Sequence, residues 1–153
     1  MSRLRPTQAV DSVLDLDLPQ LLALGKRVLI FDLDNTLCRR ATKTLDPKLS
    51  RYIAAIQQAE FQGGILTNRQ RNAEDPIVHA LRESLFVVTA AGKPKRTGYM
   101  QLLQFMRTRP ETAVMIGDKR WTDIWGANRM VIYSIQVKKI PRIPTLRSWS
   151  CVG

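Results

Sequence analysis

Short apolar runs alternate along the chain with longer stretches in which apolar residues recur every three or four positions. The runs predict buried strands, and the periodic stretches between them predict helices. Strands are expected at 28–31, 64–67, 85–88, 114–117 and 131–137, and helices at 18–24, 47–59, 76–85 and 97–107, with a short one from 122. This alternation is typical of an α/β fold in which a mostly parallel sheet is covered by helices on both faces.

The composition is that of one soluble globular domain. Of the 153 residues, 44% are hydrophobic and 24% are charged, and no apolar run approaches the roughly 18 residues needed to span a bilayer. The N-terminal segment lacks the apolar core of a secretory signal, and two cysteines are too few for a disulfide framework. We therefore expect a cytoplasmic protein with one domain over 1–153, its core at about 26–137 and a basic tail at 138–153.

The strand predicted at 28–31 ends in two carboxylates, Asp32 and Asp34, followed by Asn35-Thr36. Burying unpaired carboxylates at the end of a strand costs several kcal/mol unless a cation or hydrogen bonds compensate. The pair therefore suggests a divalent cation, and Mg²⁺ is favoured because it binds carboxylate and carbonyl oxygens. A carboxylate beside such a metal can also attack phosphorus and form an aspartyl-phosphate. The alternative is a polar turn in which Asp and Asn serve only as turn residues.

Polar residues also follow three other predicted strands. Thr67-Asn68 follow one apolar run, Gly92-Lys93-Pro94 follow the next, and Asp118 ends a third, with Asp123 five residues later. This order of DxDxT, Thr, Lys and GDxxxxD resembles the haloacid dehalogenase (HAD) superfamily of phosphatases. The wider segments FDLDNTL and GDKRWTDIWGANR resemble its subclass IIIA, in the family that contains phosphatidylglycerophosphate phosphatases.

The resemblance implies a three-layer Rossmann-like HAD core and a phosphomonoester hydrolase that works through an aspartyl-phosphate. It implies that Asp32 is the nucleophile. Asp34 would protonate the leaving oxygen and later take a proton from the attacking water. The transferring phosphoryl oxygens would then be bound by Thr67, Asn68 and Lys93, where charge must be stabilised.

The resemblance also implies a Mg²⁺ site beside the nucleophile. Its ligands would be the Asp32 carboxylate, the backbone carbonyl of Asp34 and the Asp118 carboxylate. Asp123 would lie in the second coordination shell and orient metal-bound water. Arg69 stands where the family pattern leads us to expect a second Asn, so its role is left open.

The formal net charge of +11 is unusually high, and basic residues gather just after the predicted strand ends. These residues are Arg39, Arg40, Lys43, Arg69, Arg71, Lys93, Lys95, Arg96, Lys119 and Arg120. Ligands of open α/β sheets bind at the carboxyl ends of the strands, so this charge is expected to surround the site. It would attract anionic lipid surfaces, nucleic acids or phosphorylated substrates. The alternative is a basic surface that only aids solubility.

The spacing of the motifs leaves no room for a cap domain. The gaps from Asp34 to Thr67 and from Thr67 to Lys93 each hold little more than one helix with a loop or a strand. An open site suits a phosphate presented on something large. With the family resemblance, this predicts dephosphorylation of phosphatidylglycerophosphate to phosphatidylglycerol, by an enzyme bound peripherally to the anionic inner face of a membrane. A phosphatase for nucleotides or nucleic-acid ends fits the charge equally well, and a non-enzymatic basic binding protein on the same fold is a second alternative.

Other residues carry weaker signals. The tail at 138–153 mixes basic residues with Trp and Leu, and could contact a membrane interface, nucleic-acid phosphates or the domain's own surface. Cys38 is expected to be a packing residue and His79 a surface helix residue. Trp121 and Trp125, four positions apart, are expected to pack on one helix face, with a lipid-facing role for Trp121 as the alternative. The oligomeric state is left open.

Overall fold

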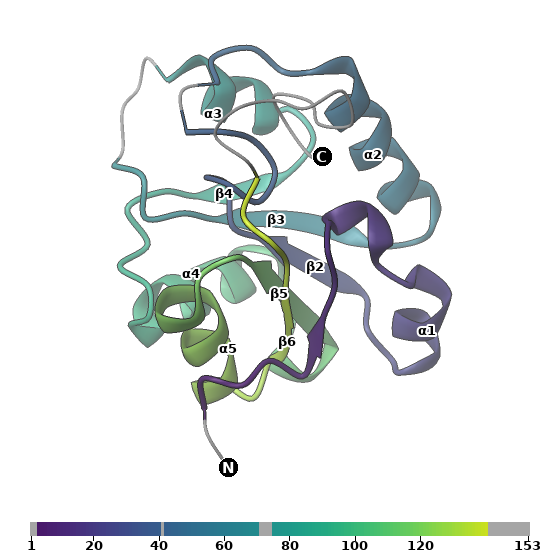
Figure 1. Cartoon of the computed structure of the whole chain (residues 1–153), viewed down its shortest axis with the longest axis vertical. Coiled ribbons are helices and arrows are strands. Elements are labelled where there is room, and N and C mark those ends of the chain that lie inside the picture. Colours follow the sequence, from purple (N-terminus) through teal and green to yellow (C-terminus); the bar gives the residue numbers. More distant parts are fainter. Residues whose placement is uncertain (1–2, 41, 71–74, 141–153) are drawn as a thin grey trace.

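A computed structural model describes residues 3–40, 42–70 and 75–140, and in these ranges the apolar runs form one six-stranded sheet (Figure 1). Its strand order is β1-β6-β5-β2-β3-β4, and every neighbouring pair is parallel. The strands are β1 (Gln8–Ala9), β2 (Val28–Phe31), β3 (Gln62–Leu66), β4 (Phe86–Val88), β5 (Ala113–Gly117) and β6 (Tyr133–Gln136). Because all strands run the same way, their carboxyl ends meet at one edge of the sheet.

Helices cover both faces of the sheet and make a three-layer structure (Figure 1). On one face lie α1 (Leu18–Ala23), α2 (Pro47–Gln58) and α3 (Pro76–Leu81). On the other face lie α4 (Arg96–Phe105) and α5 (Trp125–Arg129). Single turns complete the fold, at η1 (Val13–Asp15), η2 (Pro110–Thr112) and η3 (Arg120–Ile124).

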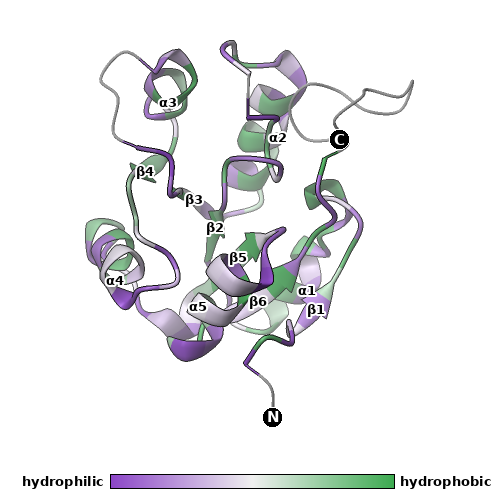
Figure 2. Cartoon of the chain, turned by 60° about the vertical axis from the view of Figure 1, so that its left-hand side comes forward, coloured by the Kyte–Doolittle hydropathy of each residue, from purple (hydrophilic) through white to green (hydrophobic). Residues whose placement is uncertain are grey.

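The central strands β2 and β5 are buried along their whole length and supply both halves of the core. Leu29 and Phe31 point toward α1, α2 and α3, whereas Val28 and Ile30 point toward α4 and α5. This division follows from the pleat, because successive side chains of a strand face opposite sides of the sheet. Strands covered on both faces are uniformly apolar, and Figure 2 shows these hydrophobic strands inside a more hydrophilic exterior.

The predicted α/β class, helix-covered sheet and absence of a cap domain are confirmed, and the sheet is wholly parallel. The loops at 32–46 and 67–75, which precede α2 and α3, are too short to hold a folded cap. Helix α3 ends at Leu81 rather than at 85, and the short helix predicted from 122 is a π-helical turn, η3, that leads into α5. Strand β1 was not predicted, because it contains only two residues. No helix in the described ranges has the length and hydropathy to cross a bilayer.

Candidate active site

The turn after β2 brings two aspartates to the carboxyl edge of the sheet. The Asp32 N–H still donates to Ile116 O (2.9 Å), so Asp32 continues the pairing of β2 with β5. The chain then turns tightly, because Asn35 adopts a left-handed conformation (φ 65°) and donates its N–H to Cys38 O (2.7 Å). Asn is among the few residues that tolerate this conformation. The turn buries Leu33 and leaves Asp32 and Asp34 lining a common cavity.

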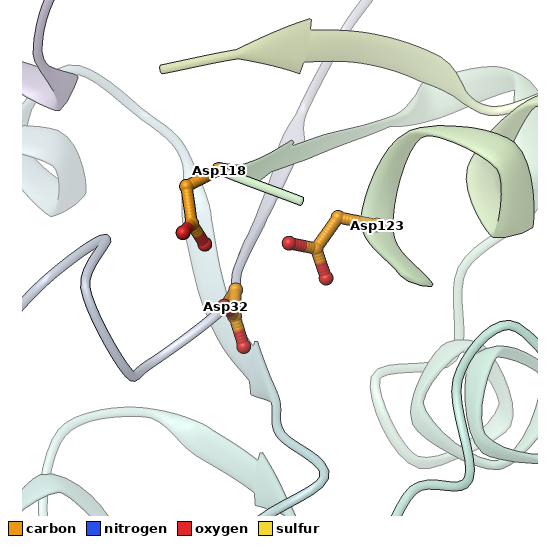
Figure 3. Close-up of side chains that lie close together, drawn as sticks. All are labelled: Asp32, Asp118 and Asp123. Atoms are coloured by element: carbon orange, nitrogen blue, oxygen red, sulfur yellow. The ribbon is translucent and has the colours of Figure 1, made fainter. Parts of the chain in front are cut away.

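Three carboxylates converge at this edge (Figure 3). Asp32 follows β2, Asp118 follows β5, and Asp123 lies in η3, with one oxygen from each within 4.8 Å of the others. Gly117 makes the approach of η3 possible, since a Cβ at that position would collide with the Asp123 carboxylate. The Asp123 carboxylate also accepts the Lys119 N–H (3.2 Å), which closes the turn between the two aspartates.

Lys93 places an ammonium group among these carboxylates. Its Nζ donates to Asp32 Oδ1 (2.8 Å) and to Asp123 Oδ1 (2.6 Å), and its side chain is only 2% exposed. The Asn68 side chain holds the Lys93 backbone from both sides, accepting its N–H (2.8 Å) and donating to its carbonyl (3.1 Å). Asn68, just after β3, therefore fixes Lys93, which neutralises the candidate nucleophile Asp32 just after β2.

Burial and mutual repulsion raise the pKa values of the three clustered carboxylates. Burial, together with the charge of Asp123, raises the pKa of Asp32 to about 6. Burial, together with the charge of Asp32, raises the pKa of Asp118 to about 6, and burial also raises the pKa of Asp123. Burial opposes the charge on Lys93, but the charges of Asp123 and Asp32 outweigh it and raise the pKa of Lys93. Three carboxylates facing one ammonium form a donor set that fits a divalent cation, which would supply the missing positive charge.

Asp34 has a separate partner. The Arg69 guanidinium forms an ion pair with Asp34 Oδ1 through Nη2 and a second ion pair with Asp75 Oδ2 through Nη1 (2.9 Å). Its Nη2 also donates to Arg40 O (3.1 Å). The three charged side chains of these pairs are 15–16% exposed, so they are partly shielded from water. Arg69, which stands where the family pattern has Asn, thus contacts both Asp34 and Asp75.

Thr67 directly follows β3 at the same edge and is 1% exposed. Its hydroxyl accepts the Arg69 N–H (3.1 Å), which leaves the hydroxyl proton available to a ligand. The Asn68 amide is engaged with the Lys93 backbone, so the structure places it as a brace for Lys93. Contact of Thr67, Asn68 and Lys93 with phosphoryl oxygens stays a prediction.

These side chains line a cavity of about 460 Å³ whose rim is basic. Its charged lining residues are Asp32, Asp34, Arg40, Arg69, Asp75, Lys93 and Lys119. The predicted gathering of basic residues around the site is therefore confirmed for Arg40, Arg69, Lys93 and Lys119. Arg71 lies outside the described residues.

Sequence reasoning missed Tyr99 as a residue of this site. It lies in the helix predicted at 97–107, where apolar spacing alone gives it no role beyond the buried face of that helix. The structure buries it fully and places its hydroxyl 2.8 Å from Thr122 O and 3.0 Å from Asp123 O, to which it donates. Tyr99 therefore anchors η3 to α4. The signal that could have found it is a tyrosine, rather than a phenylalanine, at a buried helix position, because a buried hydroxyl needs a partner.

Trp121 differs from its expected role. Its ring packs edge-on against Trp125, with centroids 6.0 Å apart, as the spacing predicted. The contact lies at the surface rather than in the core, because Trp121 is 66% exposed. Two residues near it in the chain, Lys119 and Thr122, line the cavity. The predictions for Cys38, which is buried, and His79, which is exposed, are confirmed.

Comparison with known proteins identifies the family. Residues 39–130, more than half of the chain, match the haloacid dehalogenase-like hydrolase family. The chain belongs to this family. It is therefore an enzyme, and the four motifs of the HAD superfamily lie at the carboxyl ends of its strands as the sequence order predicted.

Relatives and solved structures agree with this assignment. Over 134 residues the HAD chain is 25% identical to "Probable phosphatase YqeG" of Bacillus subtilis (strain 168), covering 86% of this chain and 76% of that protein. Its fold is similar to that of a HAD phosphatase from Thermococcus onnurineus, with a TM-score of 0.63 and 12% identity over 79% of this chain and 90% of the other. An uncharacterized protein from Listeria monocytogenes serotype 4b gives a TM-score of 0.61 and 20% identity over 79% and 86%.

Proposed function

We propose that this HAD hydrolase is a Mg²⁺-dependent phosphatase that works through an aspartyl-phosphate and acts on phosphatidylglycerophosphate. The observation that carries the chemistry is the convergence of Asp32, Asp118 and Asp123, with Lys93 paired to the first and the last, and with Asp34 two residues from Asp32. A relative bearing the name of a phosphatase supports the same reaction class.

In the first half of the reaction, an Asp32 carboxylate oxygen attacks phosphorus and the ester P–O bond breaks. Asp34 donates a proton to the departing oxygen, so that the alcohol leaves in neutral form. Lys93 holds the Asp32 carboxylate in position through Nζ (2.8 Å), and Thr67 has a hydroxyl proton to donate to a phosphoryl oxygen. Both groups stabilise charge on the transferring phosphoryl group.

In the second half, Asp34 takes a proton from a water molecule that attacks the phosphorus of the aspartyl-phosphate. The acyl P–O bond breaks, inorganic phosphate leaves, and the Asp32 carboxylate is restored. One residue can serve both steps because the second is chemically the reverse of the first. The Arg69 ion pair holds the Asp34 side chain in position beside Asp32 for both steps.

The carboxylates of Asp32 and Asp118 and the backbone carbonyl of Asp34 would hold the Mg²⁺, and Asp123 would orient its waters. When bound, the ion neutralises the charge between the nucleophile and a phosphoryl oxygen. In its absence, the raised pKa values of Asp32 and Asp118, both about 6, favour protonation of these two groups. Metal binding therefore competes with protons.

The substrate assignment rests on the open, basic mouth of the site and on the resemblance to subclass IIIA. Arg40 and Lys119 line the cavity, and Trp121, two residues after Lys119 in the chain, is 66% exposed. Cations attract anionic lipid headgroups, and tryptophan favours the membrane interface. We place the enzyme at the cytoplasmic face of an anionic membrane, where a phosphomonoester on a lipid can reach the cavity. The tail at 141–153, another predicted membrane contact, lies outside the described residues.

The same cationic rim favours one alternative, a phosphatase for a nucleotide or a nucleic-acid end. Nucleic-acid phosphates and lipid headgroups attract the same cations, and both interactions weaken with salt. The second alternative, a non-enzymatic basic binding protein, is opposed by the assembled set of Asp32, Lys93, Asp118 and Asp123. Only the choice of substrate separates the first alternative from the lipid assignment.

The test is phosphate release, with Mg²⁺ or with EDTA, from phosphatidylglycerophosphate in mixed micelles. A panel of nucleotides and of 3′- and 5′-phosphorylated oligonucleotides is measured in parallel, and Asp32→Asn is the control. We expect the lipid to be preferred and its hydrolysis to be lost with EDTA and in the variant. Preference for an oligonucleotide would move the enzyme to the first alternative. If neither wild type nor variant released phosphate from any substrate, the proposed phosphatase activity would be contradicted.

A further inference from the structure

Arg69 joins Asp34 to a residue that is remote from the reacting atoms. One end of its guanidinium contacts Asp34 Oδ1, and Nη1 donates to Asp75 Oδ2 at 2.9 Å. The planar fork of arginine suits such a bridge, because its donors point in fixed directions toward two acceptors. A hydrogen bond from Nη2 to Arg40 O (3.1 Å) fixes the plane further. Asp34 is therefore held by a guanidinium that is anchored at two further points, Asp75 and the Arg40 carbonyl.

Asp75 is itself fixed by the start of α3. Its other oxygen, Oδ1, accepts the N–H groups of Ile77 (3.2 Å) and Val78 (3.5 Å) as the N-cap of that helix. The carboxylate thus has one oxygen on the helix and one on Arg69. Such capping holds a side chain in one orientation, because it satisfies backbone donors that have no partner within the helix. The position of α3 is in this way transmitted through Arg69 to Asp34.

We propose that Arg69 and Asp75 act as a clamp that positions Asp34 for proton transfer to the leaving group, an inference that rests on the proposed function. Both are positioning residues, because they act through Asp34. The phosphoryl group has other partners, since Lys93 contacts Asp32 and Thr67 ends the neighbouring strand. An asparagine at position 69 would be too short to reach Asp34 and Asp75 together, so the clamp is a property of this chain's arginine.

A displaced Asp34 lowers the rate of phosphoryl transfer only for substrates whose leaving group must be protonated as it departs. A displacement of about 1 Å can lower a rate about 100-fold. A poor leaving group, such as the alkoxide of glycerol 3-phosphate, requires protonation as it departs. A good one, 4-nitrophenolate, departs without it. The ratio kcat/KM reports substrate binding and phosphoryl transfer to Asp32 and excludes hydrolysis of the aspartyl-phosphate, since departure of the leaving group is the first irreversible step.

The experiment measures kcat/KM for glycerol 3-phosphate and for 4-nitrophenyl phosphate with Mg²⁺, in Arg69→Gln, Arg69→Lys and Asp75→Asn. Asparagine remains a good N-cap, so Asp75→Asn removes the ion pair and keeps the helix start. We expect Arg69→Gln to lower kcat/KM for glycerol 3-phosphate about 30-fold and Asp75→Asn about 5-fold, with Arg69→Lys between them. For 4-nitrophenyl phosphate each change is expected to stay within about 3-fold. The matched control is Asp17→Asn, the N-cap of α1, which accepts the Gln20 N–H (3.1 Å).

Equal losses on both substrates would overturn the clamp, since a general loss of structure lowers both rates alike. Full activity of Asp75→Asn beside an impaired Arg69→Gln would also overturn it, because Arg69 would then act without its anchor. A loss in Arg69→Gln confined to substrates with a second anionic group would show that Arg69 contacts substrate instead. The proposed function is tested separately in the same assays: wild-type hydrolysis of 4-nitrophenyl phosphate, abolished in Asp32→Asn, supports it whatever these variants do.

Discussion

The two sides of the candidate active site differ in how their buried carboxylates are compensated by positive charge. On the nucleophile side, Asp32 and Asp123 contact the ammonium of Lys93, Asp118 lies beside them, and the Asp123 and Lys93 side chains are at most 2% exposed. On the leaving-group side, Asp34 and Asp75 share Arg69, and all three side chains are 15–16% exposed. The first side is more deeply buried and carries the larger excess of negative charge.

This difference indicates what each side still needs. Burial of an uncompensated charge is costly, and the nucleophile side responds with raised pKa values of about 6 for Asp32 and Asp118. A divalent cation would remove that cost. The leaving-group side already has a partner for each carboxylate and needs no ion. Changes on the nucleophile side should therefore have the larger effects and should depend on metal.

The largest effect is expected when the nucleophile is removed. Asp32→Asn keeps the size of the side chain and an acceptor for Lys93, but the amide cannot attack phosphorus. We expect phosphate release to fall by at least about 1,000-fold. The far-UV circular dichroism spectrum and the cooperative unfolding transition should be retained. Activity within about 10-fold of wild type would rule out Asp32 as the nucleophile.

The next largest effect is expected at Lys93. Lys93→Met leaves the carboxylates of Asp32 and Asp123 buried without their cation. We expect the metal-free protein to lose about 3 kcal/mol of unfolding free energy, measured by urea denaturation. Lys138→Met is the matched control, because its ion pair with Asp11 (3.0 Å) is 75–77% exposed and should contribute almost nothing. Equal changes in the two variants would contradict the contrast between buried and exposed charge.

A smaller effect is expected where η3 is anchored. Tyr99→Phe removes the hydroxyl that donates to Thr122 O and Asp123 O, at a cost of about 1 kcal/mol, and should lower activity several-fold by loosening Asp123. Tyr52→Phe is the matched control, since its hydroxyl donates to Val13 O (2.7 Å) beneath α2. It should cost a similar stability and leave phosphate release unchanged. A loss of activity in both variants would show that Tyr99 matters only for folding.

The smallest effect has the opposite sign. The pKa of Asp118 is raised from 3.8 to about 6, so its contribution to stability is full below pH 3.8 and is lost as pH rises through 6. Above pH 6, metal-free Asp118→Asn should therefore have a free energy of unfolding about 1 kcal/mol higher than that of wild type, after allowance for the partial exposure of Asp118. Near pH 4 the two proteins should unfold at the same urea concentration. Added Mg²⁺ should reverse the order. A destabilised variant at neutral pH without metal would contradict the charge excess.

The sequence predicted the parts of the molecule whose signals are local. Strands β2 and β5 are uninterrupted apolar runs, and their ends carry Asp32 and Asp118 directly. Parallel strands bring their carboxyl ends together, so the meeting of these motifs followed from the fold class. Gly117, the glycine of GDxxxxD, has no Cβ, and η3 can therefore approach the site closely.

The contacts that the sequence did not predict depend on the placement of whole elements. Arg69 and Asp34 are 35 positions apart, and their ion pair requires that the loops after β2 and β3 lie side by side. The role of Tyr99 was not predicted, because apolar spacing indicates the buried face of a helix and not the partner of a hydroxyl. Trp121 kept its predicted ring contact but lies on the surface, since helical spacing does not fix which ring faces solvent.

The most direct test of the central claim is mass spectrometry of the phosphoenzyme in Asp34→Asn. This variant lacks the base for the second step, while 4-nitrophenyl phosphate needs no acid in the first. After reaction with Mg²⁺ and an acid quench, we expect the peptide that contains Asp32 to gain the mass of one phosphoryl group. The gain should be absent with EDTA and in Asp32→Asn combined with Asp34→Asn. Release of 4-nitrophenol with no adduct, or an adduct on another residue, would contradict the account.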